Sequence, residues 1–187
     1  MKPTMTADLI HFIQTRYAAV HGATASVSYS RFMSCMSSAR QGAALGFRRA
    51  SEGPLFLEVY LDAPIEQVLT EQLAWQVRRA RVVEIGSLAA NSPQDLIRLR
   101  CAAACELVEE SDVGVAVLTQ RLRKMLRRIG VTLYELAPAM PERLGSQSTC
   151  WGRYYSNDPV VCASELADAR RQLARFVARR RCAECAE

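Results

Sequence analysis

The chain has 187 residues, of which half are hydrophobic and 23% are charged. This composition excludes a disordered chain and predicts one globular domain over residues 1–187. The net charge is +5 at pH 7, which favours a negatively charged partner. No stretch approaches the ~18 apolar residues of a membrane span, and the N-terminal residues lack the pattern of a secretion signal. Because the seven cysteines form no regular framework, we expect a reducing, cytoplasmic location.

The first half of the chain reads as a helix, a run of strands and a second helix. Apolar residues at helical spacing predict a helix over residues 8–21. Two β-like segments, 26–39 and 43–50, follow and are expected to form a hairpin. Strict alternation predicts a strand at 55–62, and Pro64 then opens a helix over 65–77.

In the second half, strands alternate with helices. The expected strands are 81–89, 114–119 and 131–137, with extended pieces in 150–163. The expected helices are 92–110 with Ser92 as N-cap, 120–130, and a basic C-terminal helix over 164–181 before a short cysteine-containing tail, 182–187. Together these elements predict a mixed α/β sheet with a parallel part near the middle.

Two acidic residues share one face of the predicted strand 55–62. Alternation places Glu58 and Asp62 beside Phe56 and Tyr60, because successive side chains point to opposite sides of a strand. Glu84 lies within the apolar segment "RVVEIG", where a carboxylate is expected to be paired or functional. If the two strands are neighbours, the three acids form a site that can accept a proton. Alternatively, they face water or pair with nearby arginines, namely Arg78, Arg79 or Arg81.

Other candidate residues each have a functional and a structural interpretation. A break in "IGSLA" offers backbone N–H groups at Ser87, Leu88 and Ala89. The helix 120–130 carries cations suited to an acidic partner or a phosphate, or simply presents a solvated face: Arg121, Arg123, Lys124, Arg127 and Arg128. An aromatic cluster forms an apolar wall for a ligand or packs in the core: Trp151, Tyr154 and Tyr155. The Cys182–Cys185 pair alone does not predict a metal site.

Five segments together resemble one family. "FIQTRYAAVHGA", "LFLEVYLDAPIE", "RVVEIGSLAA", "WGRYY" and "PVV" occur in the order and spacing of the thermostable hemolysins, over residues 12–163. The order of strands and helices is also similar to that of GNAT-type acyltransferases, in particular the acyl-homoserine-lactone synthase branch. The resemblance implies a GNAT-like α/β fold: a mixed, mostly antiparallel sheet with a central parallel pair and helices on both faces.

The resemblance also implies an activity, the transfer of an acyl group from a thioester to a small amine or amino-acid-like acceptor. In GNAT-type folds the end of the first helix lines the acceptor side, which assigns Arg16, Tyr17 and His21 to substrate binding; alternatively, Tyr17 belongs to the core and His21 caps the helix. We expect Glu84 to act as the base, with Glu58 and Asp62 positioning the amine.

The expected donor is an acyl-phosphopantetheine thioester, and no cofactor is expected to be bound permanently. After "VVEIG" the chain lacks the Gly-rich signature of coenzyme A-dependent GNAT enzymes, which favours an acidic acyl carrier protein over coenzyme A. No nucleic-acid motif is present, and any membrane contact is expected to be peripheral. The alternative, suggested by the family name, is a lytic or membrane-surface protein without catalytic activity.

Overall fold

The computed structural model describes residues 3–24, 29–37 and 39–184 of the chain. Within these residues the helices and strands follow in the order α1 (Pro3–His21), β1 (Arg31–Ser37), β2 (Arg40–Arg49), α2 (Ile65–Leu73), β3 (Val82–Ala90), α3 (Pro93–Leu107), β4 (Val113–Leu118), α4 (Gln120–Ile129), β5 (Tyr134–Pro138), β6 (Val160–Glu165) and α5 (Leu166–Glu184). Short 3-10 segments connect some of them: η1 (Ala50–Glu52), η2 (Phe56–Tyr60), η3 (Arg79–Arg81), η4 (Pro141–Trp151) and η5 (Tyr155–Asn157).

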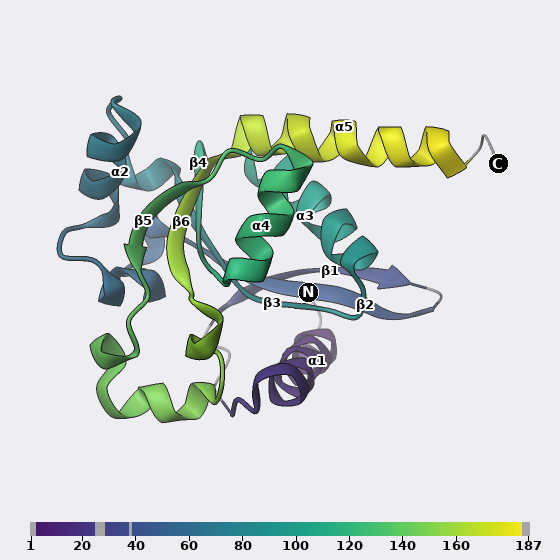
Figure 1. Cartoon of the computed structure of the whole chain (residues 1–187), viewed down its shortest axis with the longest axis horizontal. Coiled ribbons are helices and arrows are strands. Elements are labelled where there is room, and N and C mark those ends of the chain that lie inside the picture. Colours follow the sequence, from purple (N-terminus) through teal and green to yellow (C-terminus); the bar gives the residue numbers. More distant parts are fainter. Residues whose placement is uncertain (1–2, 25–28, 38, 185–187) are drawn as a thin grey trace.

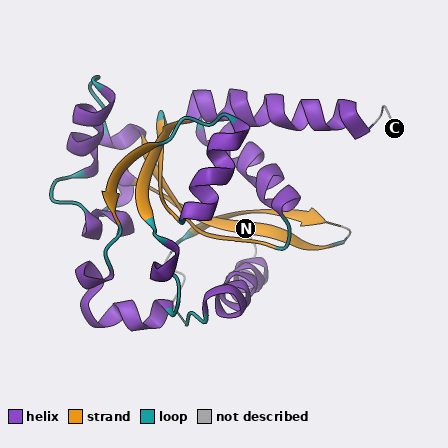
Figure 2. Ribbon diagram, in the orientation of Figure 1, coloured by secondary structure: helices purple, strands orange, loops and turns teal. Residues whose placement is uncertain are grey.

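The strands form one six-stranded sheet in the order β1-β2-β3-β4-β6-β5. The central pair β3–β4 is parallel, and every other neighbouring pair is antiparallel. Figure 2 shows the twist of this sheet, with β5 and β6 turned well away from the direction of β1 and β2. The predicted mixed sheet with a central parallel pair is therefore confirmed.

Helices cover both faces of the sheet. Along β2, Ala43 and Leu45 pack with α3, whereas Ala44 between them packs with α1, because successive side chains alternate between the faces. Segment η2 and helix α2 pack on the same face as α1, and α4 and α5 join α3 on the other. Figure 1 shows this arrangement, with α5 extending past the edge of the sheet.

Local signals in the sequence correctly predict the two helices nearest the centre. The Ser92 hydroxyl accepts a hydrogen bond from the Asp95 N–H and caps α3, and Pro93 occupies its first turn. Gly130 ends α4 in the left-handed conformation, with φ of 98°.

The predicted strand at 55–62 is wrong. Its central part, Phe56–Tyr60, is the 3-10 segment η2. In a 3-10 helix, residues three apart lie on one side, so Leu57 and Tyr60 are both buried and Glu58 faces another direction. The alternating apolar residues therefore belong to a tight helical turn that packs on the sheet, and not to a strand of the sheet.

The central strands β3 and β4 separate soon after they meet. Their parallel pairing covers only Val82–Glu84 against Val113–Val115. Beyond Glu84, the pairing of β3 with β2 shifts by one residue, and Ser87 takes a φ of +48°, which identifies a β-bulge. The predicted break in "IGSLA" is therefore present, at Ser87. The strands leave a gap between them that opens to both faces of the sheet.

No helix within the described residues is long and apolar enough to cross a membrane. The side chains of Cys182 and Cys185 lie outside the described part of the chain.

Candidate functional site

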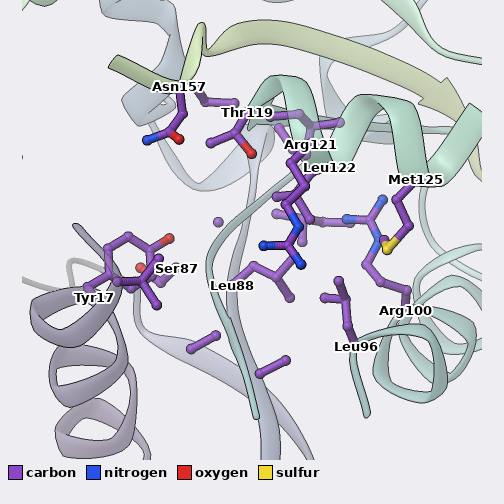
Figure 3. Close-up of a pocket in the computed structure, with 18 of the residues that line it drawn as sticks. Tyr17, Ser87, Leu88, Leu96, Arg100, Thr119, Arg121, Leu122, Met125 and Asn157 are labelled. Atoms are coloured by element: carbon purple, nitrogen blue, oxygen red, sulfur yellow. The ribbon is translucent and has the colours of Figure 1, made fainter. Parts of the chain in front are cut away.

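A cavity of about 1400 Å³ occupies the gap between β3 and β4. Because strand residues alternate between faces, its lining divides into two compartments. The first lies on the α1 face and is lined by Arg16, Tyr17, His21, Tyr29, Phe56, Tyr60, Glu84, Trp151 and Tyr154, among others. The second lies on the α3–α4 face and is lined by Leu96, Ile97, Arg100, Arg121, Leu122, Lys124, Met125, Arg128 and Phe176, among others. Figure 3 shows Ser87 and Leu88 of β3 between Tyr17 and Arg121.

Glu84 is the acid of the first compartment. It is only 2% exposed, and its two carboxylate oxygens accept hydrogen bonds from the backbone N–H groups of Phe56 at 2.9 Å and Leu57 at 3.0 Å. A third hydrogen bond joins it to the Tyr29 hydroxyl. Burial raises the pKa of Glu84 above its usual value, although these hydrogen bonds act in the opposite direction. The result is a carboxylate held in one orientation and made more basic than a surface acid.

Two glycines make room for the Tyr29 ring beside Glu84. Gly46 of β2 and Gly86 of β3 are paired across the sheet. A Cβ atom at Gly86 would lie 2.1 Å from the Tyr29 hydroxyl oxygen, and one at Gly46 would lie 2.6 Å from the ring. Gly86 is therefore needed for the close approach of this ring, whereas the positive φ of the bulge falls on Ser87.

Aromatic side chains form one wall of the first compartment. The ring of Tyr154 lies 5.3 Å from that of Trp151, 5.2 Å from His21 and 6.5 Å from Tyr17. The Tyr17 hydroxyl bonds the backbone of Leu88, within the bulge, and burial raises its pKa to about 12. These phenols stay neutral at physiological pH, so the wall offers ring faces and hydroxyl dipoles but no charge.

Two buried polar atoms at the end of α1 have no hydrogen-bond partner within the described residues. They are Nε of Arg16 and Nδ1 of His21. Burial, followed by the nearby charge of Arg153, lowers the pKa of His21 below its usual value, so this imidazole is neutral at pH 7. Unsatisfied buried polar atoms are rare in folded proteins and call for an explanation, such as an ordered water, an ion or a catalytic role. Arg16 and His21 both line the cavity, which leaves these two atoms available to a ligand.

Glu58 and Asp62 do not join Glu84 in the cavity, so the predicted cluster of three acids is not formed. Glu58 pairs with Arg79 at 2.6 Å and accepts hydrogen bonds from the Leu55 and Ile65 N–H groups. Asp62 has a side chain that is 85% exposed and pairs with Arg143 on the surface. The reason is the 3-10 geometry of η2, which turns Phe56 and Tyr60 towards the cavity but Glu58 away from it.

Three further predicted residues lie outside the cavity lining. One is the exposed Arg127, which pairs with Glu135 at 2.8 Å. Arg123 is buried beneath α4, where it donates hydrogen bonds to Leu118 O at 2.9 Å, Asp158 O at 2.6 Å and the Asp158 carboxylate at 2.7 Å. These bonds join α4 to the end of β4 and to the segment just before β6. The hydroxyl groups of Tyr155 and Tyr60 share a hydrogen bond of 2.6 Å, in which either can be the donor.

The other predicted residues line the cavity, but the sequence reasoning missed several of its polar members. Tyr29 and Arg100 both line it and neither was a candidate. A signal was available for Arg100, which follows Leu96 by one helical turn and precedes Ala103 and Ala104 on a face of α3 that is otherwise apolar. Tyr29 carried no such signal, because its position depends on the two glycines across the sheet.

Comparison with known proteins identifies the family. The family model described as thermostable hemolysin matches residues 2–170. The chain belongs to the thermostable hemolysin family. No curated protein sequence matches it.

Solved structures with the same fold include synthases of acyl-homoserine lactones and of N-acyl amino acids. TofI, solved in a ternary complex with an inhibitor and MTA, superposes with a TM-score of 0.64 and 16% identity over 93% of this chain and 92% of that chain. FeeM, an N-acyl amino acid synthase from uncultured soil microbes, gives a TM-score of 0.60 and 14% identity over 91% of this chain and 95% of the FeeM chain. BjaI, a coenzyme A-dependent acyl-homoserine lactone synthase solved with SAM and isopentyl-CoA, superposes with a TM-score of 0.60 and 10% sequence identity. The match covers 94% of this chain and 83% of the BjaI chain. This family member therefore has the GNAT-like fold of the acyl-homoserine lactone synthases.

Proposed function

We propose that this protein is an N-acyltransferase that moves an acyl group from a phosphopantetheine thioester to the amino group of a small, amino-acid-like acceptor. The observation that carries the proposal is the separation of β3 and β4 beyond Glu84. It joins a compartment with a buried acid to a compartment with a basic rim, through the sheet. Two different substrates entering from opposite faces would meet at this gap. The shared fold of the acyl synthases supports the same interpretation.

The acceptor suits the α1 compartment. Aromatic faces attract a cationic ammonium group, and Glu84 can take its proton directly or through water. The unpartnered Nε of Arg16 offers a hydrogen bond to a carboxylate on the same molecule. A molecule with one amino group and one carboxylate group can interact with Glu84 and with Arg16 at the same time.

The reaction balances with the groups present. The neutral amine attacks the thioester carbonyl carbon, so that a C–N bond forms and the C–S bond breaks. Glu84 first releases to water the proton that it took from the ammonium group. It then accepts the proton that nitrogen loses on attack and passes it to the departing sulfur, which leaves an amide and a free thiol. Beyond Glu84 the edge of β3 no longer pairs with β4. Because the Leu88 backbone already bonds the Tyr17 hydroxyl, the backbone N–H at the Ser87 bulge is the group that we assign to stabilise the developing oxyanion.

The donor is an acyl carrier protein thioester in preference to coenzyme A. Asp95 lies in the first turn of α3 and is 5% exposed. Its carboxylate, which accepts a hydrogen bond from the Ser92 hydroxyl at 2.7 Å, places a negative charge at the helix end where a diphosphate would otherwise be favoured. The exposed rim of α4, formed by Arg121, Lys124 and Arg128, suits an acidic carrier.

The direct test is thiol release. Purified protein is mixed with a series of acyl carrier protein and coenzyme A thioesters and a panel of amino acids and amines, and the products are identified by mass spectrometry. Thiol release that depends on the acceptor supports the proposal. A panel without any amide product, together with lysis of red cells by the protein in the absence of thioester, would instead favour a lytic protein.

A further inference from the structure

Arg100 is an arginine buried inside the second compartment of the cavity. It is 8% exposed, and it occupies the same face of α3 as Leu96 and Ala103, which pack in the core. In Figure 3 its side chain rises from α3 towards α4 and ends near Met125. The guanidinium therefore lies between two helices and lines the cavity.

No counter-charge accompanies this guanidinium. Within residues 3–24, 29–37 and 39–184, no carboxylate pairs with Arg100 and no acceptor receives a hydrogen bond from it; burial alone lowers its pKa, to about 10. The other buried arginine, Arg123, has a full set of acceptors that includes the Asp158 carboxylate. A buried charge without a partner is costly, and proteins keep such charges mainly where a ligand completes them.

The surroundings of Arg100 are apolar, with more cations at the rim. Ile97, Leu122 and Phe176 line the compartment from three helices. Arg121, whose side chain points into the cavity in Figure 3, and Lys124 stand at its edge. Among the described residues that line the cavity, Glu84 is the one acidic residue, and it lies on the opposite face of the sheet. The compartment thus combines apolar walls with an uncompensated positive charge.

We propose that the α3–α4 compartment binds an oxyanion attached to an apolar body, with Arg100 as the buried anchor of that oxyanion. Two parts of a thioester donor supply this chemistry: a carboxylate at the far end of its acyl chain, or the phosphate of its pantetheine arm. A guanidinium matches both groups with paired hydrogen bonds. The inference deepens the proposed function and rests on it for the nature of the donor, but it concerns binding alone.

Titration calorimetry on the full chain tests the inference with two matched pairs of probes. Dodecanoate and dodecanol differ in the carboxylate, and pantetheine 4′-phosphate and pantetheine differ in the phosphate. We expect the wild-type protein to prefer the anionic member of at least one pair by roughly tenfold or more. Arg100→Met should abolish that preference, and the pair affected identifies the source of the oxyanion. Arg98→Met, on the exposed side of the same helix, is the control and should keep it.

A preference that survives in Arg100→Met, or that is absent from the wild type in both pairs, overturns the inference. The melting temperature gives an independent reading, with Arg100→Gln as a second variant. Removal of an unpaired buried charge should raise the melting temperature of the unliganded protein, whereas a marked fall in both variants would make Arg100 structural and also overturn it. Binding that depends on Arg100 without any acyl transfer would leave this inference standing and remove the proposed function.

Discussion

The carboxylate of Glu84 in β3 accepts a hydrogen bond from the backbone N–H of Leu57, 27 residues earlier in the chain, at 3.0 Å. Its other oxygen accepts the Phe56 N–H at 2.9 Å. This buried acid therefore fixes η2 on the sheet and, through it, places the rings of Phe56 and Tyr60 along the cavity. Any change at Glu84 acts on both the chemistry and the shape of the site.

Replacement of Glu84 by Gln should lower turnover by roughly 10²–10⁴-fold, as expected for a lost general base. The amide has one acceptor oxygen in place of two, so one buried N–H of η2 loses its partner, and stability should fall by about 1–3 kcal/mol. Steady-state kinetics and thermal unfolding measure the two effects. Glu58→Gln is the matched control, because Glu58 lies outside the cavity; a Glu84→Gln variant with unchanged turnover would contradict the assignment.

The pH dependence of kcat/KM should show a limb that belongs to Glu84. Since burial raises the pKa of this carboxyl above its usual value, activity should fall as the pH drops through that raised pKa. His21, whose pKa is lowered, also titrates on the acid side, so the profile is measured for wild type and for His21→Gln. If the limb persists in His21→Gln, it reports Glu84; if it vanishes there, His21 is responsible.

Acid stability should depend on Glu58. Hydrogen bonding to Arg79 is the main cause that lowers the pKa of Glu58, to about 2. The stabilisation is therefore present above the unfolded pKa of about 4.5 and is lost as the pH falls through about 2. Because Arg79 is partly exposed, we expect about 2 kcal/mol. Denaturant unfolding from pH 6 to pH 2 should show a smaller loss for Glu58→Gln than for wild type, and equal losses would refute the assignment.

Gly86→Ala should displace the Tyr29 ring. The added Cβ would lie 2.1 Å from the Tyr29 hydroxyl oxygen, so we expect a loss of about 1–3 kcal/mol from overpacking. The double variant with Tyr29→Ala provides the control, because removal of the ring relieves the clash. Unfolding free energies of the four proteins in this cycle should therefore be non-additive; additive losses would show that the ring does not occupy this space.

Charge reversal at the rim should affect use of the carrier protein. Arg121→Glu and Lys124→Glu should raise KM for acyl carrier protein thioesters, most strongly at low salt, with little effect on coenzyme A thioesters. Arg170→Glu on the exposed side of α5 makes the same change of charge away from the cavity and is the control. Equal effects of all three reversals would indicate a general charge effect and not a docking surface.

How much of the fold could be predicted depended on how local each signal was. The cap at Ser92, the end of α4 at Gly130 and the strand around Glu84 were all predicted correctly, since each depends on a few adjacent residues. Segment η2 was mistaken for a strand because "LFLEVYL" alternates over too few residues to separate a period of two from a tight turn. What decides it is Glu84, far along the chain, which binds the N–H groups of the turn.

The candidate site was predictable in part for the same reason. A lone acid in an apolar strand indicated Glu84, and Trp151 and Tyr154 of "WGRYY" do line the cavity, as does Tyr17 of α1. The sequence could not indicate which arginine of α4 turns inward, and Arg123 proved to be a structural residue bound to Asp158. That distinction depends on where Asp158, just before β6, lies in the folded protein, and no local sequence pattern predicts this position.

Because β3 and β4 separate early, the opening that joins the two compartments through the sheet is formed by the backbone of these strands. Side chains such as Ile97 and Met125 only set how long and wide its α3–α4 end is. Larger or smaller residues at these two helix positions should therefore change the length of the molecule accepted while the strands, the bulge at Ser87 and Glu84 keep their places. Selectivity for chain length is thus open to redesign from the helices alone.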